Sequence, residues 1–103
     1  MDIKLMYFDE CPSWQTAFEN LKQVLLSEQI SDAVILVKIE NDERAQQEKF
    51  LGSPSIWIDG QDLWTEERES YSLSCRVYAT PNGVKGFPTF QMLRSKIQTM
   101  AKA

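Results

Sequence analysis

The sequence contains no histidine among its 103 residues. This absence excludes catalytic sites of the Ser-His-Asp and Cys-His types, metal sites with imidazole ligands and imidazole acid–base catalysis. Glycine and proline are also scarce, at 4 residues each. With 43% hydrophobic, 11% aromatic and 25% charged residues, the composition is that of one folded domain spanning residues 1–103.

Positive charge and long apolar runs are scarce as well. The chain has 11 Lys and Arg against 15 Asp and Glu, a net charge of -4. This balance argues against nucleic acid and anionic membranes as partners, because both bind basic surfaces. No run of about 18 apolar residues occurs, so no membrane-spanning helix is expected. The N-terminus lacks the features of a signal peptide, and we expect a cytoplasmic protein.

Cysteine is limited to Cys11 and Cys75. Two cysteines are too few for a disulfide scaffold. They are also too few for a structural zinc site with four ligands. No glycine-rich phosphate-binding pattern is present, and no cofactor is predicted.

The first third of the chain predicts a strand followed by a helix. Residues 3–8 are apolar, β-branched or aromatic, which favours a strand. Proline is preferred at the first position of a helix, so Cys11-Pro12 is expected to open the helix. An apolar stripe at helical spacing follows, formed by Trp14, Phe18, Leu21 and Leu25.

A second strand and helix are predicted next. Residues 34–37 form a continuous apolar run, which is typical of a strand covered on both faces. Asn41 or Asp42 can cap a short helix that runs to about Phe50-Leu51. Gly52 is expected to end this helix in a left-handed conformation.

The second half of the chain predicts two strands and a last helix. Residues 55–58 form a short strand closed by the turn Asp59-Gly60, and residues 61–72 are expected to be a loop. Period-two alternation then predicts a half-buried strand with three residues facing the core, Leu73, Cys75 and Val77. After a turn at 80–83, Pro88 starts a helix with an apolar stripe formed by Phe90, Leu93, Ile97 and Met100.

The predicted element order is β-α-β-α-β-β-α. Strand–helix–strand units give parallel pairing, and the third and fourth strands add an antiparallel edge. The expected fold class is therefore α/β, with a mixed four-stranded sheet and helices on both faces.

Cys11 is the residue with the clearest chemical potential. A thiol between a strand and the start of a helix lies near unpaired N–H groups and the positive end of the helix dipole. This position favours the thiolate, although Asp9 and Glu10 oppose a further negative charge. The alternative interpretation is that Cys11 has no chemical role and is a small apolar residue that caps the helix beneath a loop.

These motifs resemble the thioredoxin-like superfamily. The chain is similar to small bacterial thioredoxin-like proteins, including selenoproteins, that begin with Tyr-Phe-Asp-x-Cys-Pro, and it also contains Gly52-Ser53-Pro54-Ser55 before a strand. The resemblance implies that Cys11 is the active-site cysteine and Pro54 a cis-proline opposite it. It also implies that Ser53 offers its backbone N–H and C=O to a substrate peptide or to glutathione. Pro12 and Trp14 are further candidates for contact with the substrate, and the alternative for Trp14 is a core residue at helical spacing.

The sequence departs from the dithiol pattern of that family at Trp14, which stands where a second cysteine belongs. An intermediate on Cys11 therefore needs another thiol to resolve it, either Cys75 or an external one such as glutathione; the remaining alternative is that Cys11 has no redox cycle. One interpretation of Cys75 is an inert core thiol. In the expected topology it lies far from Cys11. Residues 74–78 are also faintly similar to the second-thiol segment of alkylmercury lyases, which implies two thiolates and a carboxylate from Asp9 or Glu10.

Three functions follow from these observations. The first is a thiol-dependent oxidoreductase or thiol-exchange protein acting on a protein disulfide or a low-molecular-weight thiol through Cys11. The second is a non-enzymatic module that binds a protein through the same groove or through Trp64. The third is soft-metal or organomercurial handling by Cys11 and Cys75.

Overall fold

The sheet is built around β1 (Ile3–Tyr7), which lies between two partners. It pairs in parallel with β2 (Val34–Lys38) and antiparallel with β3 (Ser55–Ile58), and β3 pairs antiparallel with β4 (Gln61–Asp62). The order is β2-β1-β3-β4. The computed structural model describes residues 1–101, which form a mixed α/β fold with this four-stranded sheet.

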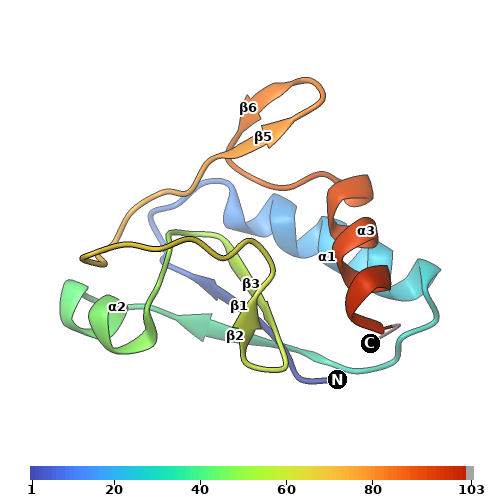
Figure 1. Cartoon of the computed structure of the whole chain (residues 1–103), viewed down its shortest axis with the longest axis horizontal. Helices are drawn as coiled ribbons and strands as arrows, with labels where there is room; N and C mark the ends of the chain where they lie inside the picture. The colour runs from blue at the N-terminus through green and yellow to red at the C-terminus, as the bar shows by residue number, and fades with distance from the viewer. Residues whose placement is uncertain (102–103) are drawn as a thin grey trace.

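Helices cover both faces of the sheet within the described part of the chain. The helices α1 (Trp14–Ser27) and α3 (Phe90–Ala101) pack together on one face, and α2 (Asp42–Glu48) lies on the other (Figure 1). Alternate residues of β1 face the two sides. The first core contains Ile3, Leu5, Leu21, Ile56, Leu93 and Ile97, and the second contains Met6, Ile39, Ala45 and Phe50.

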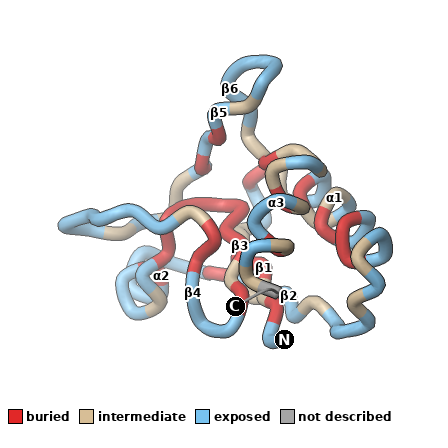
Figure 2. Tube along the Cα trace, turned by 45° about the vertical axis from the view of Figure 1, so that its right-hand side comes forward, coloured by how far each residue is buried: buried red, intermediate tan, exposed pale blue. Residues whose placement is uncertain are grey.

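A two-stranded hairpin projects away from the sheet. It consists of β5 (Tyr78–Thr80) and β6 (Gly83–Lys85), and its turn lies where the sequence predicts one. Figures 1 and 2 show this hairpin standing clear of the helices, with its outer part exposed. No helix among residues 1–101 is long and apolar enough to cross a membrane.

The fourth strand of the sheet differs from the prediction. It is β4, which begins directly after the turn at 59–60, and not residues 73–77. The predicted inward face of residues 73–77 is also wrong, because Arg76 and Tyr78 are buried while Cys75 and Val77 are exposed. The polar side chains of Arg76 and Tyr78 form hydrogen bonds inside the protein. These bonds stabilise the observed orientation more than burial of the alternating apolar side chains would stabilise the predicted one.

The strand β2 is less covered than its apolar sequence predicts. Ile35 is 52% exposed and Leu36 is 40% exposed. The strand lies at the edge of the sheet, with β1 as its neighbour on one side, and the helices cover it only in part. The expectation of a strand covered on both faces is therefore wrong.

The helix boundaries shift by a few residues from those predicted. The helix α1 begins at Trp14 with Ser13 as its N-cap, so Pro12 precedes the helix. Asn41 caps α2 as expected, its Oδ1 accepting from the N–H of Arg44 at 2.8 Å. Lys49, and not Gly52, takes the left-handed conformation that ends α2.

Candidate functional site

The loop between α2 and β3 is buried from Phe50 onward. Residues 50–56 form an unbroken buried stretch, which is visible in Figure 2 between α2 and β3. The peptide bond between Ser53 and Pro54 is cis, as the resemblance implies. Gly52 has a φ of +117°, and a Cβ there would lie 2.9 Å from the Cβ of Arg76. Glycine is required here because the chain around Arg76 approaches so closely.

Cys11 lies beneath this loop and is almost completely buried. It is only 2% exposed, and its thiol donates a hydrogen bond to the carbonyl of Ser53 at 3.4 Å. The expectation that Cys11 lies directly at the start of a helix, near its unpaired N–H groups, is therefore wrong. The helix begins later, at Trp14, and the sulfur contacts a carbonyl acceptor.

Cys75 lies next to Cys11 and faces solvent. Its backbone forms a parallel β-bridge with Ser53, the same residue that accepts from the Cys11 thiol. Both thiols are free, with Cys11 buried and Cys75 exposed. The interpretation of Cys75 as a buried core thiol far from Cys11 is thus wrong, because residues 73–77 do not extend the sheet but return across the buried loop.

The two thiols influence each other electrostatically. Partial burial raises the pKa of the Cys75 thiol, and the charge of Cys11 and a hydrogen bond with it raise that pKa further. An upward shift of the Cys75 pKa is expected, because a thiolate beside another negatively charged group is unfavourable. The side chain of Cys11 therefore acts directly on the Cys75 thiol.

The backbone of Ser53 is already paired with the chain around Cys75. Its N–H donates to the carbonyl of Ser74 at 2.8 Å, and its carbonyl accepts from the N–H of Arg76 at 2.9 Å. These are the groups that the resemblance assigns to a substrate. In this structure the protein's own chain occupies both of them.

Arg76 anchors that chain inside the protein. It is 6% exposed, and its guanidinium contacts Asp62 at 2.9 Å, the hydroxyl of Ser55 at 3.1 Å and the carbonyl of Trp64. Burial raises the pKa of the Asp62 carboxyl even though the Arg76 charge acts to lower it. A charged pair this well buried is held by its hydrogen bonds, since each group alone would be costly in the interior.

Tyr78 continues the anchor on the same side of the chain. Its hydroxyl donates to the carbonyl of Pro54 at 2.6 Å, and burial raises the pKa of the phenol above its usual range. Its ring meets the ring of Trp64 edge-on, with centroids 5.2 Å apart. Trp64 is thereby folded down onto the first core and not presented as a free contact.

The remaining predicted site residues lie at the rim. Pro12 is exposed in the turn after Cys11. Trp14 is half-buried, stacks on the ring of Tyr7 with centroids 4.2 Å apart, and packs against the first core. Its role in the structure is thus packing at the start of α1.

The carboxylates near Cys11 do not join the thiols. Asp9 forms an ion pair with Lys38. Among residues 1–101, no three His, Cys, Asp or Glu side chains gather as metal ligands. A third ligand of the kind that the lyase similarity implies is therefore not supplied by the described residues.

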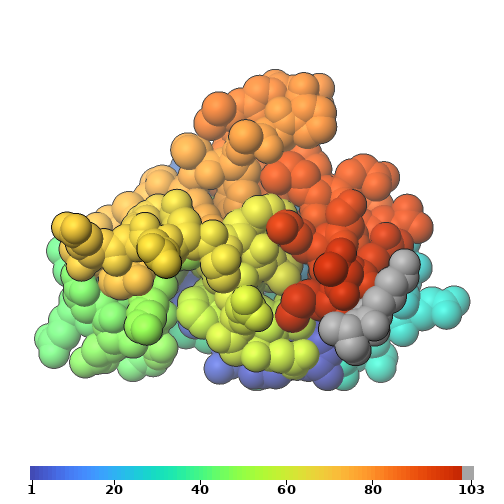
Figure 3. Space-filling view, in the orientation of Figure 1, coloured from blue at the N-terminus to red at the C-terminus, as the bar shows by residue number. Residues whose placement is uncertain are grey.

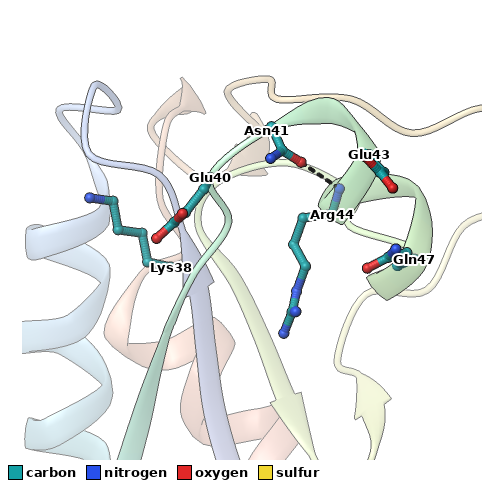
Figure 4. A pocket seen from close by; sticks show the side chains of 6 residues that line it. All are labelled: Lys38, Glu40, Asn41, Glu43, Arg44 and Gln47. Carbon is teal, nitrogen blue, oxygen red and sulfur yellow. Dashed lines mark hydrogen bonds between the residues drawn. The ribbon is translucent and has the colours of Figure 1, made fainter.

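Two polar cavities lie near the ends of β1 and β2. One, of about 460 Å³, lies between the end of β2 and α2 and is drawn in Figure 4 with its lining residues Lys38, Glu40, Asn41, Glu43, Arg44 and Gln47. The other, of about 450 Å³, adjoins the Cys11 loop. Its wall includes Phe8, Asp9, Glu10 and Leu73, so it runs alongside the chain that leads to Cys75.

Sequence reasoning did not find Arg76, Tyr78, Asp62 or Ser55 as parts of this site. The available signal was the same period-two pattern, shifted by one residue, which places Arg76 and Tyr78 on the inner face. A comparison with protein-family models, curated proteins and solved structures finds no match for this chain.

Proposed function

We propose that this protein is a thiol–disulfide oxidoreductase whose redox centre is the pair Cys11 and Cys75. The observation that carries the proposal is that both cysteines contact Ser53, Cys11 through its thiol and Cys75 through its backbone. Two thiols that lie next to each other can be oxidised to a disulfide bond and reduced again.

A thioredoxin-like fold is part of the proposal. Three observations support it: the order β2-β1-β3-β4, the antiparallel β3 beside parallel β1 and β2, and the cis bond before Pro54 next to the Cys11 loop. The cysteine missing at position 14 is replaced by Cys75, which reaches the site from a distant part of the sequence.

The reaction balances with the two thiols alone. Cys11 and Cys75 give up two protons and two electrons to a substrate disulfide, which becomes two thiols while one S–S bond forms in the protein. The reverse reaction oxidises two substrate thiols. A reducing compartment such as the cytoplasm keeps the pair in its dithiol state.

The test is a redox titration of the whole chain. We equilibrate it with graded ratios of reduced and oxidised glutathione, alkylate the remaining thiols and measure the intact mass. The expected result is that both thiols disappear together as an intramolecular disulfide, which peptide mapping assigns to Cys11 and Cys75. Cys11→Ser and Cys75→Ser lose this species. Two thiols that stay free throughout, or that react independently, contradict the proposal.

Binding of a soft metal ion is a second candidate that the paired thiols favour. Two thiolates are the preferred ligands of soft ions such as mercury. This function predicts one mercury ion per chain, with affinity lost in either Cys11→Ser or Cys75→Ser. The protein-binding alternative has less support, because Ser53 is paired internally and Trp64 is packed on Tyr78.

A further inference from the structure

The two sulfurs of the pair differ sharply in access. Cys11 is 2% exposed, whereas Cys75 is exposed. Thiol–disulfide exchange requires the attacking sulfur to approach along the S–S axis, so access decides which sulfur is attacked. An outside molecule reaches Cys75 first.

The chain around Cys75 also closes the backbone edge beside Cys11. We call residues 71–76 the covering segment. It pairs with both polar groups of the Ser53 backbone, through the carbonyl of Ser74 and the N–H of Arg76. An extended polypeptide that paired with Ser53 would first have to displace this segment, because each backbone N–H and C=O is already used.

The covering segment is held along its whole length. The carbonyl of Tyr71 accepts from the side chain of Gln46 at 2.7 Å, and the N–H of Leu73 donates to Asp42 at 2.9 Å. At its other end the guanidinium of Arg76 is bound to Asp62. Figure 3 shows the yellow-to-orange chain that precedes β5 lying against the green residues of α2. Displacing the segment would break these bonds together.

We infer that Cys75 is the sulfur that exchanges with substrate, that Cys11 resolves the intermediate, and that the substrate is a low-molecular-weight thiol or disulfide and not an extended polypeptide. This inference rests on the proposed function and specifies its order of steps. It reverses the order expected from the position of Cys11 near the first helix.

The steps follow from the positions of the two thiols. Cys75 loses its proton to solvent, and its thiolate attacks a small disulfide R–S–S–R. This attack forms Cys75–S–S–R and releases R–S⁻, which takes up a proton. Cys11 then loses its proton and attacks the Cys75 sulfur, forming the Cys11–Cys75 bond and releasing the second R–S⁻. In the reverse direction an outside thiolate attacks the Cys75 sulfur and displaces the Cys11 thiolate. Cys11 then takes up a proton, and its thiol again donates a hydrogen bond to the carbonyl of Ser53.

The cavity beside the covering segment suits the body of a small zwitterionic thiol. Its volume is about 450 Å³, and its wall carries the cation Lys38 and the anions Asp9, Glu10 and Glu40. Lys38 is paired with Asp9, so the ammonium group of a peptide thiol such as glutathione would meet the carboxylates of Glu10 and Glu40 there.

The experiment uses the whole chain with Cys11→Ala and Cys75→Ala, exposed to glutathione disulfide and quenched with acid. We expect Cys11→Ala to accumulate glutathione on Cys75, because no resolving thiol remains. In Cys75→Ala, glutathione should appear on Cys11 at least ~10-fold more slowly, because a buried thiol is poorly accessible. A disulfide within an extended peptide should react with Cys11→Ala more slowly than glutathione disulfide does.

A rapid-quench measurement on the unmodified protein guards against variants that fail to fold. With glutathione disulfide below one equivalent, the transient mixed disulfide should map to Cys75. A mixed disulfide on Cys11, or equal rates for the two variants, overturns the inference about the order of the two cysteines. The proposed function still stands in that case if the Cys11–Cys75 bond forms. Preference for the peptide disulfide overturns the substrate class. If the unmodified protein forms no internal disulfide, the proposed function fails instead.

Discussion

Cys75 and Arg76 are neighbours in the sequence but face opposite environments. Arg76 points into the protein and is 6% exposed, whereas Cys75 points outward into solvent beside Cys11. The inner residues of this stretch, Arg76 and Tyr78, make buried hydrogen bonds to the loop around Pro54. The outer residues include Val77, which is 66% exposed despite its apolar side chain.

Polar bonds, and not apolar burial, therefore fix the position of Cys75. If apolar burial decided the register, Val77 would face the core and Cys75 with it. The inner face therefore holds the segment in place, and the outer face carries the thiol that we propose to be reactive. Substitutions on the inner face should affect folding most, and substitutions of the cysteines should affect reactivity.

Arg76→Met should have the largest effect. It leaves the Asp62 carboxyl buried without its partner, and breaking a buried ion pair in this way costs about 3–5 kcal/mol of unfolding free energy. Urea denaturation measures the loss. The double variant Arg76→Met with Asp62→Leu should regain most of it, and Arg68→Met, in a pair on the exposed loop, should change little. A loss in Arg76→Met no greater than in Arg68→Met contradicts the anchoring role.

Gly52→Ala should come next. At this φ of +117° a side chain is strained, and its Cβ would lie 3.1 Å from the Arg76 backbone nitrogen, so we expect a loss of about 2–3 kcal/mol. Gly60→Ala is the matched control, because Gly60 also has a positive φ but nothing within 4 Å. Its cost should be about 1 kcal/mol, from the backbone alone. Equal losses in the two variants would show that the contact with Arg76 is unimportant.

Tyr78→Phe should have a smaller effect on stability. It removes the hydroxyl that donates to the Pro54 carbonyl at 2.6 Å and leaves a buried acceptor without this donor, at a cost of about 1–2 kcal/mol. Tyr71→Phe, in the covering segment, serves as the control for loss of a tyrosine hydroxyl. A Tyr78→Phe protein as stable as the control would show that the hydrogen bond from Tyr78 to Pro54 does not help to anchor this chain.

Cys11→Ala should reduce the free energy of unfolding less than the three preceding substitutions do. Its main effect should be to lower the pKa of the Cys75 thiol. The charge of Cys11 and its hydrogen bond both raise the pKa of Cys75, so removing them lowers that pKa toward its usual value. Burial also raises it and persists in the variant, so the shift should be partial. The rate of iodoacetamide alkylation at Cys75, followed by mass spectrometry from neutral to alkaline pH, measures it. A profile that does not move, or that moves to higher pH, contradicts the coupling of the two thiols.

Local patterns in the sequence predict most of the sheet and helices. The apolar residues of β1 and β3, the Asn41 cap and the stripe of α3 are all recognisable, because each depends on residues close together in the sequence. The cis bond before Pro54 also follows from the family resemblance.

The path of residues 73–77 could not be predicted in the same way. Their alternation fits two registers, and the choice between them depends on Asp62, Ser55 and Pro54, which become neighbours only in the folded protein. The error in register also hid the site, because it turned Cys75 inward and placed it far from Cys11. The inward position of the Arg76 side chain thus goes together with the outward position of Cys75 beside Cys11.

The most direct test of the account is the order in which the two cysteines of the native, reduced protein are alkylated. At mildly alkaline pH, with a limiting amount of iodoacetamide and peptide mapping, we expect Cys75 to be modified first and Cys11 to react only slowly until urea unfolds the chain. Cys11 modified as fast as Cys75 in the native protein would contradict the account, because it would mean that the covering segment does not shield the inner sulfur.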